Sequence, residues 1–156
     1  SSAKDLSVVV ASDHAAVAAK RIVTDTLAAL GVACHDLGAH DDRSVDYPDY
    51  AAEVASAVSE GRATRGVLLC GTGIGMSIAA NKFPGVRAAL VHDVTTARMS
   101  RLHNDANVLV LGGGLLGDRL LRDIVEAWFA TEFEGGRHQR RLDKIAAVER
   151  AAKAPR

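Results

Sequence analysis

The sequence predicts an α/β fold, a three-layer α/β/α sandwich in which helices cover both faces of one five-stranded parallel sheet. Five short apolar runs alternate with longer segments that carry apolar residues at helical spacing. The most apolar runs are continuous, as in strands that are buried on both faces of a parallel sheet. No linker, repeat or low-complexity segment divides residues 1–156, so we expect a single domain. The strand order that we expect is 2-1-3-4-5, which is common in open sheets of this kind.

The first two expected strands enclose a helix. The run LSVVVAS at 6–12 is short, continuous and rich in valine, which favours a strand buried on both faces. Segment 15–30 carries apolar residues at helical spacing and ends before Gly31, a residue suited to the position that follows a helix. VACHDLG at 32–38 is a weaker run, and it predicts the second strand.

The middle of the chain is expected to hold a third strand between two helices. Pro48 suits the first turn of a helix, and residues 49–59 are amphipathic. The run GVLLC at 66–70 predicts the strand. A glycine-rich loop follows it directly, and a short helical pattern then extends to about Lys82.

The last part of the chain is expected to contain two strands and three helices. VRAALV at 86–91 and ANVLVLG at 106–112 are strand-like runs. Between them, Asp93 is a typical N-cap for a helix at 94–102. Two further helical patterns follow, at 115–130 and 138–150.

Composition excludes several classes of partner. Nineteen basic and nineteen acidic side chains cancel, so no net field attracts the chain to nucleic acid or to an anionic membrane. There is no signal-like pattern and no apolar run of membrane length. Two cysteines, Cys34 and Cys70, are too few for a secreted disulfide scaffold. We therefore expect a cytoplasmic protein with a small-molecule ligand, and neither nucleic acid nor membrane as partner.

The expected topology indicates where that ligand binds. In open parallel sheets, ligands bind beyond the carboxyl ends of the strands, at the point where the strand order reverses. With the order 2-1-3-4-5, that point lies between the first and the third strand. The loops that leave from there are Ser12-Asp13-His14 and Cys70-Gly71-Thr72-Gly73-Ile74-Gly75, and both carry titratable or nucleophilic side chains.

The glycine loop CGTGIGM does not match the common nucleotide and phosphate motifs. A dinucleotide fingerprint would need its third glycine at Met76, and a phosphatase loop would need an arginine there. A P-loop would need its lysine directly after the last glycine, whereas Lys82 comes too late. What remains is a set of backbone N–H groups at a helix N-terminus, which can receive an anion or an oxyanion.

The cysteine at the start of this loop has two interpretations. A helix N-terminus favours Cys70 as a thiolate, and a thiolate beside an oxyanion receptor can remove a carbon-bound proton and stabilise the enolate. Alternatively, Cys70 is a buried strand-end thiol and the glycines serve close packing. A second run, Gly112 to Gly117, fits G-x-G-x-x-G, but it follows the fifth strand and is a weak signal for a nucleotide.

Histidines and arginines add candidates for binding. His14 lies at the expected switch point, whereas His103 precedes the fifth strand and therefore belongs to the opposite end of the sheet. His103 is either structural or serves the site of a neighbouring subunit. Arg137 and Arg141 lie four residues apart and could bind a phosphate, although the spacing equally fits a solvated basic face. No group has the spacing of a metal site, so we expect no metal and no cofactor.

Six segments together resemble one enzyme family, the type B ribose-5-phosphate isomerases, which also includes the galactose-6-phosphate isomerase subunits. The segments are SDHA, SVDYPDYA, CGTGIGMSIAANK, RAALVHD, ARMSRLHNDANVLVLG and TEFEGGRHQRRLDKI. They occur in order over about residues 7 to 146. The resemblance implies a Rossmann-like fold and no metal cofactor. It further implies a homodimer or dimer of dimers with active sites at the subunit interface, and a last helix that packs on the partner.

The same resemblance implies an aldose–ketose isomerase of carbohydrate metabolism and the pentose phosphate pathway. It would interconvert ribose 5-phosphate and ribulose 5-phosphate through an enediolate. The implied catalytic residues are Cys70 as the base, Thr72 as the hydroxyl that assists proton movement, and His103 as the group that opens the sugar ring. Some relatives use a glutamate in place of the cysteine, but Met76 stands at that position here. The implied substrate-binding residues are Asp13, His14, Tyr47, Gly71, Gly73, Ile74, Gly75, Asn104, Arg137 and Arg141.

One departure from the family pattern leaves the substrate open. After the fifth strand the family usually carries a phosphate-binding arginine, and this chain has Gly114 there. A hydrogen bond to a charged group contributes about 1.5–3 kcal/mol, so its loss would weaken phosphate binding. The alternatives are an isomerase of another pentose or hexose, with or without phosphate, and a non-catalytic module that binds a nucleotide or sugar phosphate.

Overall fold

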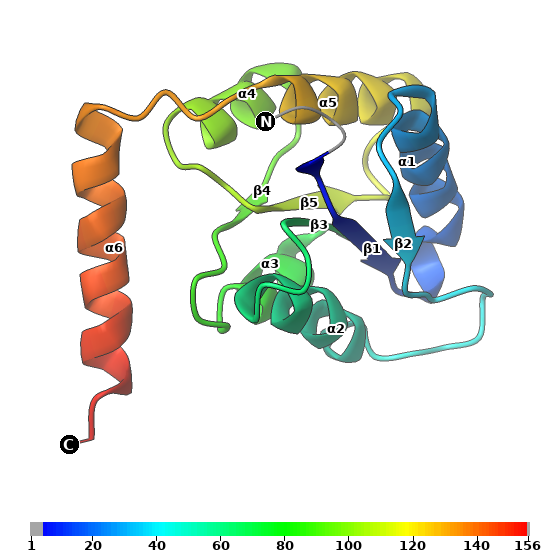
Figure 1. Ribbon diagram of the computed structural model, residues 1–156. Helices are drawn as coiled ribbons and strands as arrows, with labels where there is room; N and C mark the ends of the chain where they lie inside the picture. The colour runs from blue at the N-terminus through cyan, green and yellow to red at the C-terminus, as the bar shows by residue number, and fades with distance from the viewer. Residues whose placement is uncertain (1–4, 156) are drawn as a thin grey trace.

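A computed structural model describes residues 5–155 and confirms the predicted α/β sandwich (Figure 1). One parallel sheet of five strands lies between two layers of helices. The elements are β1 (Val8–Ser12), the 3-10 helix η2 (His14–Ala16), α1 (Val17–Ala29), β2 (Cys34–Asp36), α2 (Tyr47–Ser59), β3 (Arg65–Cys70), α3 (Ile74–Ala80), β4 (Ala88–Leu90), α4 (Val94–Leu102), β5 (Val108–Gly112), α5 (Asp118–Ala130) and α6 (Arg137–Lys153).

The observed strand order is β2-β1-β3-β5-β4, so the predicted order 2-1-3-4-5 is wrong in its last two positions. β5 is buried along all five residues and pairs with β3 from Gly66↔Val108 to Cys70↔Gly112. β4 has only three residues, all partly exposed, and it forms the edge of the sheet. The longer and more apolar strand therefore takes the interior position. The switch point between β1 and β3 is unaffected, since β1 still separates β2 from β3.

Successive side chains of the buried strands point to opposite faces of the sheet, so apolar residues form one layer on each face. Val8 and Val10 of β1 pack with α1, α4 and α5, and the fully buried Trp128 belongs to this layer. Val9 of β1 packs instead with α2 and α3, in a layer that also contains Cys70. Figure 1 shows the two helix layers on opposite sides of the strands. Cys70 thus lies at the end of β3, the central strand of the sheet.

Local signals in the sequence account for several element ends. Gly31 has φ +73°, the left-handed conformation expected of a residue that follows a helix. The Asp93 carboxylate accepts a hydrogen bond of 2.6 Å from the Thr96 N–H, so the predicted N-cap of α4 is confirmed. Pro48 lies in the first turn of α2, also as predicted.

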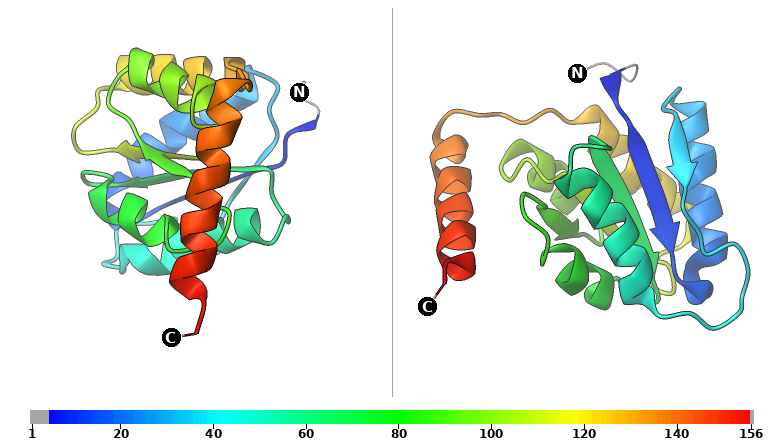
Figure 2. Two further views of the ribbon diagram at one scale, coloured as in Figure 1. Left: turned by 90° about the vertical axis from the view of Figure 1, so that its left-hand side faces the viewer. Right: turned by 60° about the horizontal axis from the view of Figure 1, so that its bottom comes forward.

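Helix α6 stands beside the sandwich rather than within it. Figures 1 and 2 show it joined to α5 by an extended segment, residues 131–136. Among its described residues only His138 and Leu142 are buried, whereas Ile145 and Val148 are 52% and 69% exposed. One apolar side of α6 is therefore uncovered in the single chain. Between residues 5 and 155, no helix combines the length and apolarity needed to cross a membrane.

Candidate active site

The first group of predicted site residues lies at the carboxyl ends of β1 and β3. Asp13 follows β1, and its N–H donates a hydrogen bond of 3.2 Å to the carbonyl of Leu69 in β3. The Asp13 carboxylate accepts a hydrogen bond of 3.0 Å from the Ala15 N–H, which fixes the turn into η2. The loop after β1 is thus tied to the strand that carries Cys70.

The loop between β2 and α2 lies against the same strand ends. Ser12 exchanges two backbone hydrogen bonds of 2.8 Å with this loop, one to the Gly38 carbonyl and one from the Ala39 N–H. Farther along, the Val45 N–H donates a hydrogen bond of 3.1 Å to Nδ1 of His14. Because Nδ1 accepts, the proton of the neutral His14 ring resides on Nε2, which is free to act as a donor.

The glycine loop places main-chain donors around the Cys70 sulfur. Cys70 ends β3 and is 6% exposed, and the Gly73 N–H donates a hydrogen bond of 3.2 Å to its Sγ. Gly73 has φ +82°, a conformation that favours glycine, and α3 begins at the next residue. The Thr72 hydroxyl accepts a hydrogen bond of 3.2 Å from the Ile74 N–H. The Cys70 sulfur thus accepts a main-chain hydrogen bond at the start of α3.

The second glycine run supports this loop from the neighbouring strand. The Gly113 N–H donates to the Cys70 carbonyl at 2.8 Å, and the Gly114 N–H donates to the Gly71 carbonyl at 2.9 Å. A Cβ added to Gly112 would lie 2.7 Å from the Thr72 carbonyl oxygen, far closer than any side chain tolerates. Close backbone packing against the Cys70 loop therefore accounts for Gly112 and Gly114, and close packing on Ala16 and Ala19 of the first helical region accounts for Gly113.

Tyr47 contacts the glycine loop from the start of α2. A Cβ added to Gly75 would lie 2.3 Å from Cε1 of the Tyr47 ring, so this ring lies directly on the backbone of Gly75. Tyr47 is 38% exposed, so its side chain is accessible to solvent while its ring touches the loop. The structure thus brings Tyr47 beside the loop that carries Cys70 and Thr72.

This contact predicts the effect of one substitution. Gly75→Ala should lower the free energy of unfolding by about 1–3 kcal/mol, because the new methyl group overlaps the Tyr47 ring. In an unobstructed helix the same change would stabilise by about 1 kcal/mol. Thermal and urea unfolding measure the difference, with Gly71→Ala as a control whose added Cβ would meet no atom within 4 Å. The cost should vanish in a Tyr47→Ala background, and an equal cost in both backgrounds would contradict the assignment.

The second group of predicted site residues lies around the start of α6. His103, Asn104, Arg137 and Arg141 line a cavity of about 400 Å³, together with His138, Leu142 and Ile145. His103 follows α4, and both arginines are exposed on one side of α6. The predicted phosphate-binding arginines and the predicted ring-opening histidine therefore share one cavity.

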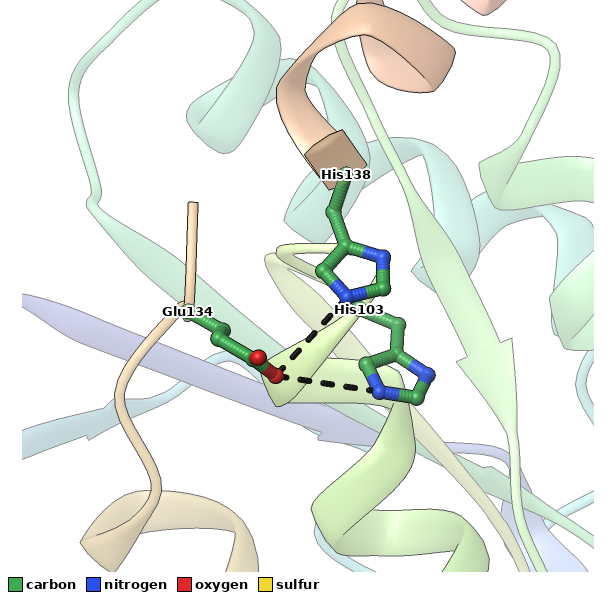
Figure 3. A group of neighbouring side chains, drawn as sticks. All are labelled: His103, Glu134 and His138. Carbon is green, nitrogen blue, oxygen red and sulfur yellow. Dashed lines mark ion pairs between the residues drawn. The ribbon is translucent and has the colours of Figure 1, made fainter. Parts of the chain in front are cut away.

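Sequence reasoning missed two members of this second group, Glu134 and His138. The rings of His103 and His138 stack with centroids 4.2 Å apart and planes inclined by 15°. Oε2 of Glu134 lies 3.8 Å from Nε2 of His103 and 3.7 Å from Nε2 of His138 (Figure 3). Burial and the neighbouring His103 both lower the pKa of His138, which favours its neutral form. No spacing signals this contact, because Glu134 lies in the segment before α6 and His103 is distant in the sequence.

The two groups lie at opposite ends of the parallel sheet. Cys70 is the last residue of β3, whereas His103 and Asn104 precede the first residue of β5, Val108. In Figure 1 the arrowheads of β1 and β5 point to the right, and α6 stands on the left. The expectation that His103 lies away from its own Cys70 loop is therefore met.

Two curated proteins align with nearly the whole chain. The chain is 44% identical over 137 residues to ribose-5-phosphate isomerase B of Escherichia coli, an alignment that covers 88% of this chain and 92% of that protein. It is 41% identical over 150 residues to D-erythrulose-4-phosphate isomerase of Pectobacterium atrosepticum, covering 95% of this chain and 98% of that protein.

Solved structures agree with the sequence comparisons. Ribose-5-phosphate isomerase B of Clostridium thermocellum matches with a TM-score of 0.92 and 47% identity, covering 95% of this chain and all of that one. The Mycoplasma genitalium enzyme with bound ribulose-5-phosphate matches with a TM-score of 0.89 and 41% identity, over 94% of this chain and 97% of that one. The family model described as Ribose/Galactose Isomerase matches residues 8–145. The chain therefore belongs to the ribose/galactose isomerase family of sugar-phosphate isomerases.

Proposed function

We propose that this protein interconverts ribose 5-phosphate and ribulose 5-phosphate, with Cys70 as the base. The observation that carries the proposal is the contact of the Gly73 N–H with the Cys70 sulfur, 3.2 Å long, at the switch point of the sheet. A thiolate held beside main-chain donors has both parts that proton transfer next to a carbonyl requires, a base and an oxyanion receptor. A relative with 41% identity was solved with ribulose-5-phosphate bound, which supports the substrate class.

The proposed reaction moves one hydrogen between adjacent carbons. The Cys70 thiolate removes the proton on C2 of the open-chain aldose, and the electron pair of that bond forms the C1–C2 double bond of an enediolate. The N–H groups of the Gly71–Gly75 loop stabilise the negative oxygen. Thr72, an exposed hydroxyl at the loop, assists proton movement from O2 to O1. The Cys70 thiol then returns its proton to C1, which yields the ketose and regenerates the thiolate.

No carboxylate replaces Cys70 in this role. Met76, which stands where some relatives carry a glutamate, is fully buried in the apolar layer between β3, α2 and α3. Its side chain has no proton to exchange, and the cysteine is the titratable group on this loop. The proposal therefore assigns the whole proton transfer to the sulfur.

The rest of the active site is proposed to come from a second copy of the chain. His103 would open the sugar ring, and Arg137 and Arg141 would bind the phosphate, yet their cavity lies at the far end of the sheet from Cys70. A symmetric dimer can bring this cavity of one copy to the Cys70 loop of the other. The uncovered apolar side of α6, with Ile145 and Val148, supports packing on a partner.

A second candidate function is the isomerisation of a different sugar. Gly114 stands where the family usually carries a phosphate-binding arginine, and a Cβ there would lie only 3.0 Å from the Gly71 carbonyl oxygen. A relative with 41% identity is a D-erythrulose-4-phosphate isomerase, so the family accepts shorter substrates. Phosphate binding in this chain would then rest on Arg137 and Arg141.

A substrate panel in deuterated water tests both candidates. The protein should convert ribose 5-phosphate to ribulose 5-phosphate and leave deuterium on the exchanged carbon. The values of kcat/KM for ribose 5-phosphate, ribose, allose 6-phosphate and erythrulose 4-phosphate then rank the sugars. A higher value for another sugar would replace the lead substrate, and turnover of none of them would reject isomerase function. Stabilisation by nucleotides without turnover would favour a binding module.

A further inference from the structure

Lys20 is a charged side chain that is buried near the start of α1. It is only 3% exposed, and its ammonium group donates a hydrogen bond of 2.6 Å to Oδ1 of Asp36, the last residue of β2. The same ammonium group also donates to the carbonyl of Ala39. Oδ1 of Asp36 in turn accepts a hydrogen bond of 2.9 Å from the Gly38 N–H. Lys20 therefore connects α1 to the first residues of the loop between β2 and α2, which lie side by side in Figure 1.

The burial of this ammonium group is better explained by geometry than by stability. Removing a charge from water is costly, and an apolar side chain in place of a buried ion pair often leaves a protein equally stable. An apolar side chain cannot, however, hold a carboxylate and a main-chain carbonyl in fixed positions. Ala39 is 4% exposed, and its carbonyl accepts its hydrogen bond from Lys20. The contacts of Lys20 thus specify where the main chain runs after β2.

The segment that Lys20 holds is bonded to the end of β1. The Ser12 N–H donates to the Gly38 carbonyl, and the Ala39 N–H donates to the Ser12 carbonyl, both at 2.8 Å. Asp13 and His14, which are expected to bind the substrate, follow Ser12 directly. A displacement of residues 38–39 would therefore be passed to these two residues through the main chain.

The far end of the same loop holds the His14 side chain. The Val45 N–H donates to Nδ1 of His14, and residues 40–44 between the two ends of the loop are exposed. The loop is therefore held from its ends. Lys20 is the buried side chain that fixes the end next to β2.

We propose that Lys20 is a positioning residue for substrate binding, an inference that rests on the proposed isomerase function. Through Gly38 and Ala39 it fixes Ser12, and thereby the main chain at Asp13 and His14. Lys20 does not contact the sugar itself, since its ammonium group is buried and bonded to Asp36 and Ala39. Its loss should weaken binding of the sugar phosphate and leave the proton transfer at the glycine loop intact.

Lys20→Met tests this role, because methionine keeps most of the apolar stem and removes the ammonium group. The KM for ribose 5-phosphate should rise about tenfold while kcat changes by less than about twofold, as expected when uniform binding is lost. Amide hydrogen exchange, measured without substrate, should become at least about tenfold faster at Ser12, Gly38 and Ala39.

Thr26→Val is the matched control on the same helix. Thr26 is 5% exposed, and its hydroxyl donates a hydrogen bond of 2.6 Å to the Ile22 carbonyl within α1. The change therefore removes a buried hydrogen bond from α1 without touching the loop after β2. KM and the exchange rates at Ser12, Gly38 and Ala39 should remain those of the wild type.

Asp36→Ala is a second variant that tests the same contact from the other side. The Asp36 side chain is 37% exposed, and Lys20 and Asp36 line a cavity of about 280 Å³ through which water can reach the ammonium group. This variant should therefore fold even if Lys20→Met does not. It should raise KM and speed exchange at Gly38, whose N–H loses its acceptor.

Three outcomes would overturn the proposal. Unchanged exchange at Gly38 and Ala39 in both variants would mean that Lys20 does not hold the loop. Faster exchange with the KM of the wild type would mean that the loop does not position the substrate. A fall in kcat with unchanged KM would place the effect of Lys20 on the chemical step. If the wild type turns over none of the sugars, the isomerase function itself fails, and the exchange rates still decide separately whether Lys20 fixes the loop.

Discussion

Cys70→Ala is expected to lower kcat for isomerisation by about 10²- to 10⁴-fold, the range that a positioned general base contributes. The change removes the only group at the glycine loop that can carry the proton between carbons, while the loop itself keeps its hydrogen bonds to Gly113 and Gly114. Binding of the sugar phosphate should change little, since the proposed phosphate ligands lie on α6. Steady-state kinetics should therefore show the loss in kcat with KM nearly unchanged.

Cys34→Ala is the matched control for this prediction. Cys34 lies in β2 and is partly buried, and burial together with the Asp36 carboxylate raises the pKa of its thiol. It therefore stays protonated at neutral pH, and its removal should leave turnover unchanged. Circular dichroism and thermal unfolding establish that both variants are folded. Equal turnover by Cys70→Ala and Cys34→Ala, with deuterium still entering the product, would remove the sulfur from the mechanism.

Mixing two inactive variants is expected to restore about a quarter of wild-type activity, because half of the dimers formed at random are mixed and each has one intact site. The first variant is Cys70→Ala, and the second carries Arg137→Ala with Arg141→Ala. Both arginines are exposed, so their loss should not disturb the fold. In a mixed dimer with the proposed arrangement, the Cys70 loop of one copy would face the arginines of the other, and one of the two sites would have every group that it needs.

The control for this experiment keeps all three substitutions in one chain. A dimer of this triple variant with Cys70→Ala has no intact Cys70 loop and should remain inactive. Variants are mixed after partial denaturation and refolded together, and tagged mixed dimers are then purified for assay. If purified mixed dimers of the first two variants stay inactive, the arginines and the cysteine of one site come from the same chain, and the two-copy arrangement is wrong.

The sequence was sufficient for most of the fold because local signals and apolar periodicity agree there. The N-cap Asp93 and the glycine after α1 fix element ends through contacts within a few residues. The order of β4 and β5 depends on something different, namely which strand can bury more apolar surface next to β3. The run VRAALV is about as apolar as the run ANVLVLG that forms β5, yet only three of its residues pair in the sheet. Helix α5 begins at Asp118 rather than at 115, because the glycine run before it packs on the Cys70 loop.

The candidate site was predictable in pieces. Cys70 and the glycine loop form a short local pattern whose chemistry can be argued from residue types alone. The cluster of His103, Glu134 and His138 could not be found that way, because its members belong to three segments that only the tertiary fold brings together. Tyr47 is an intermediate case: its contact with Gly75 joins α2 to α3, and no spacing in the sequence measures it. The resemblance to a known family supplied Tyr47 and His103. The structure supplies their neighbours, which are Gly75 for Tyr47 and Glu134 and His138 for His103.

The placement of α6 outside the sandwich makes catalytic activity dependent on protein concentration under the proposed arrangement. In the proposed arrangement each copy contributes its last helix to the neighbour's site, so a chain on its own would hold the halves of two different catalytic centres. Specific activity should then fall upon dilution without any unfolding, as copies separate. A newly synthesised chain would be inactive until it associates with a second copy.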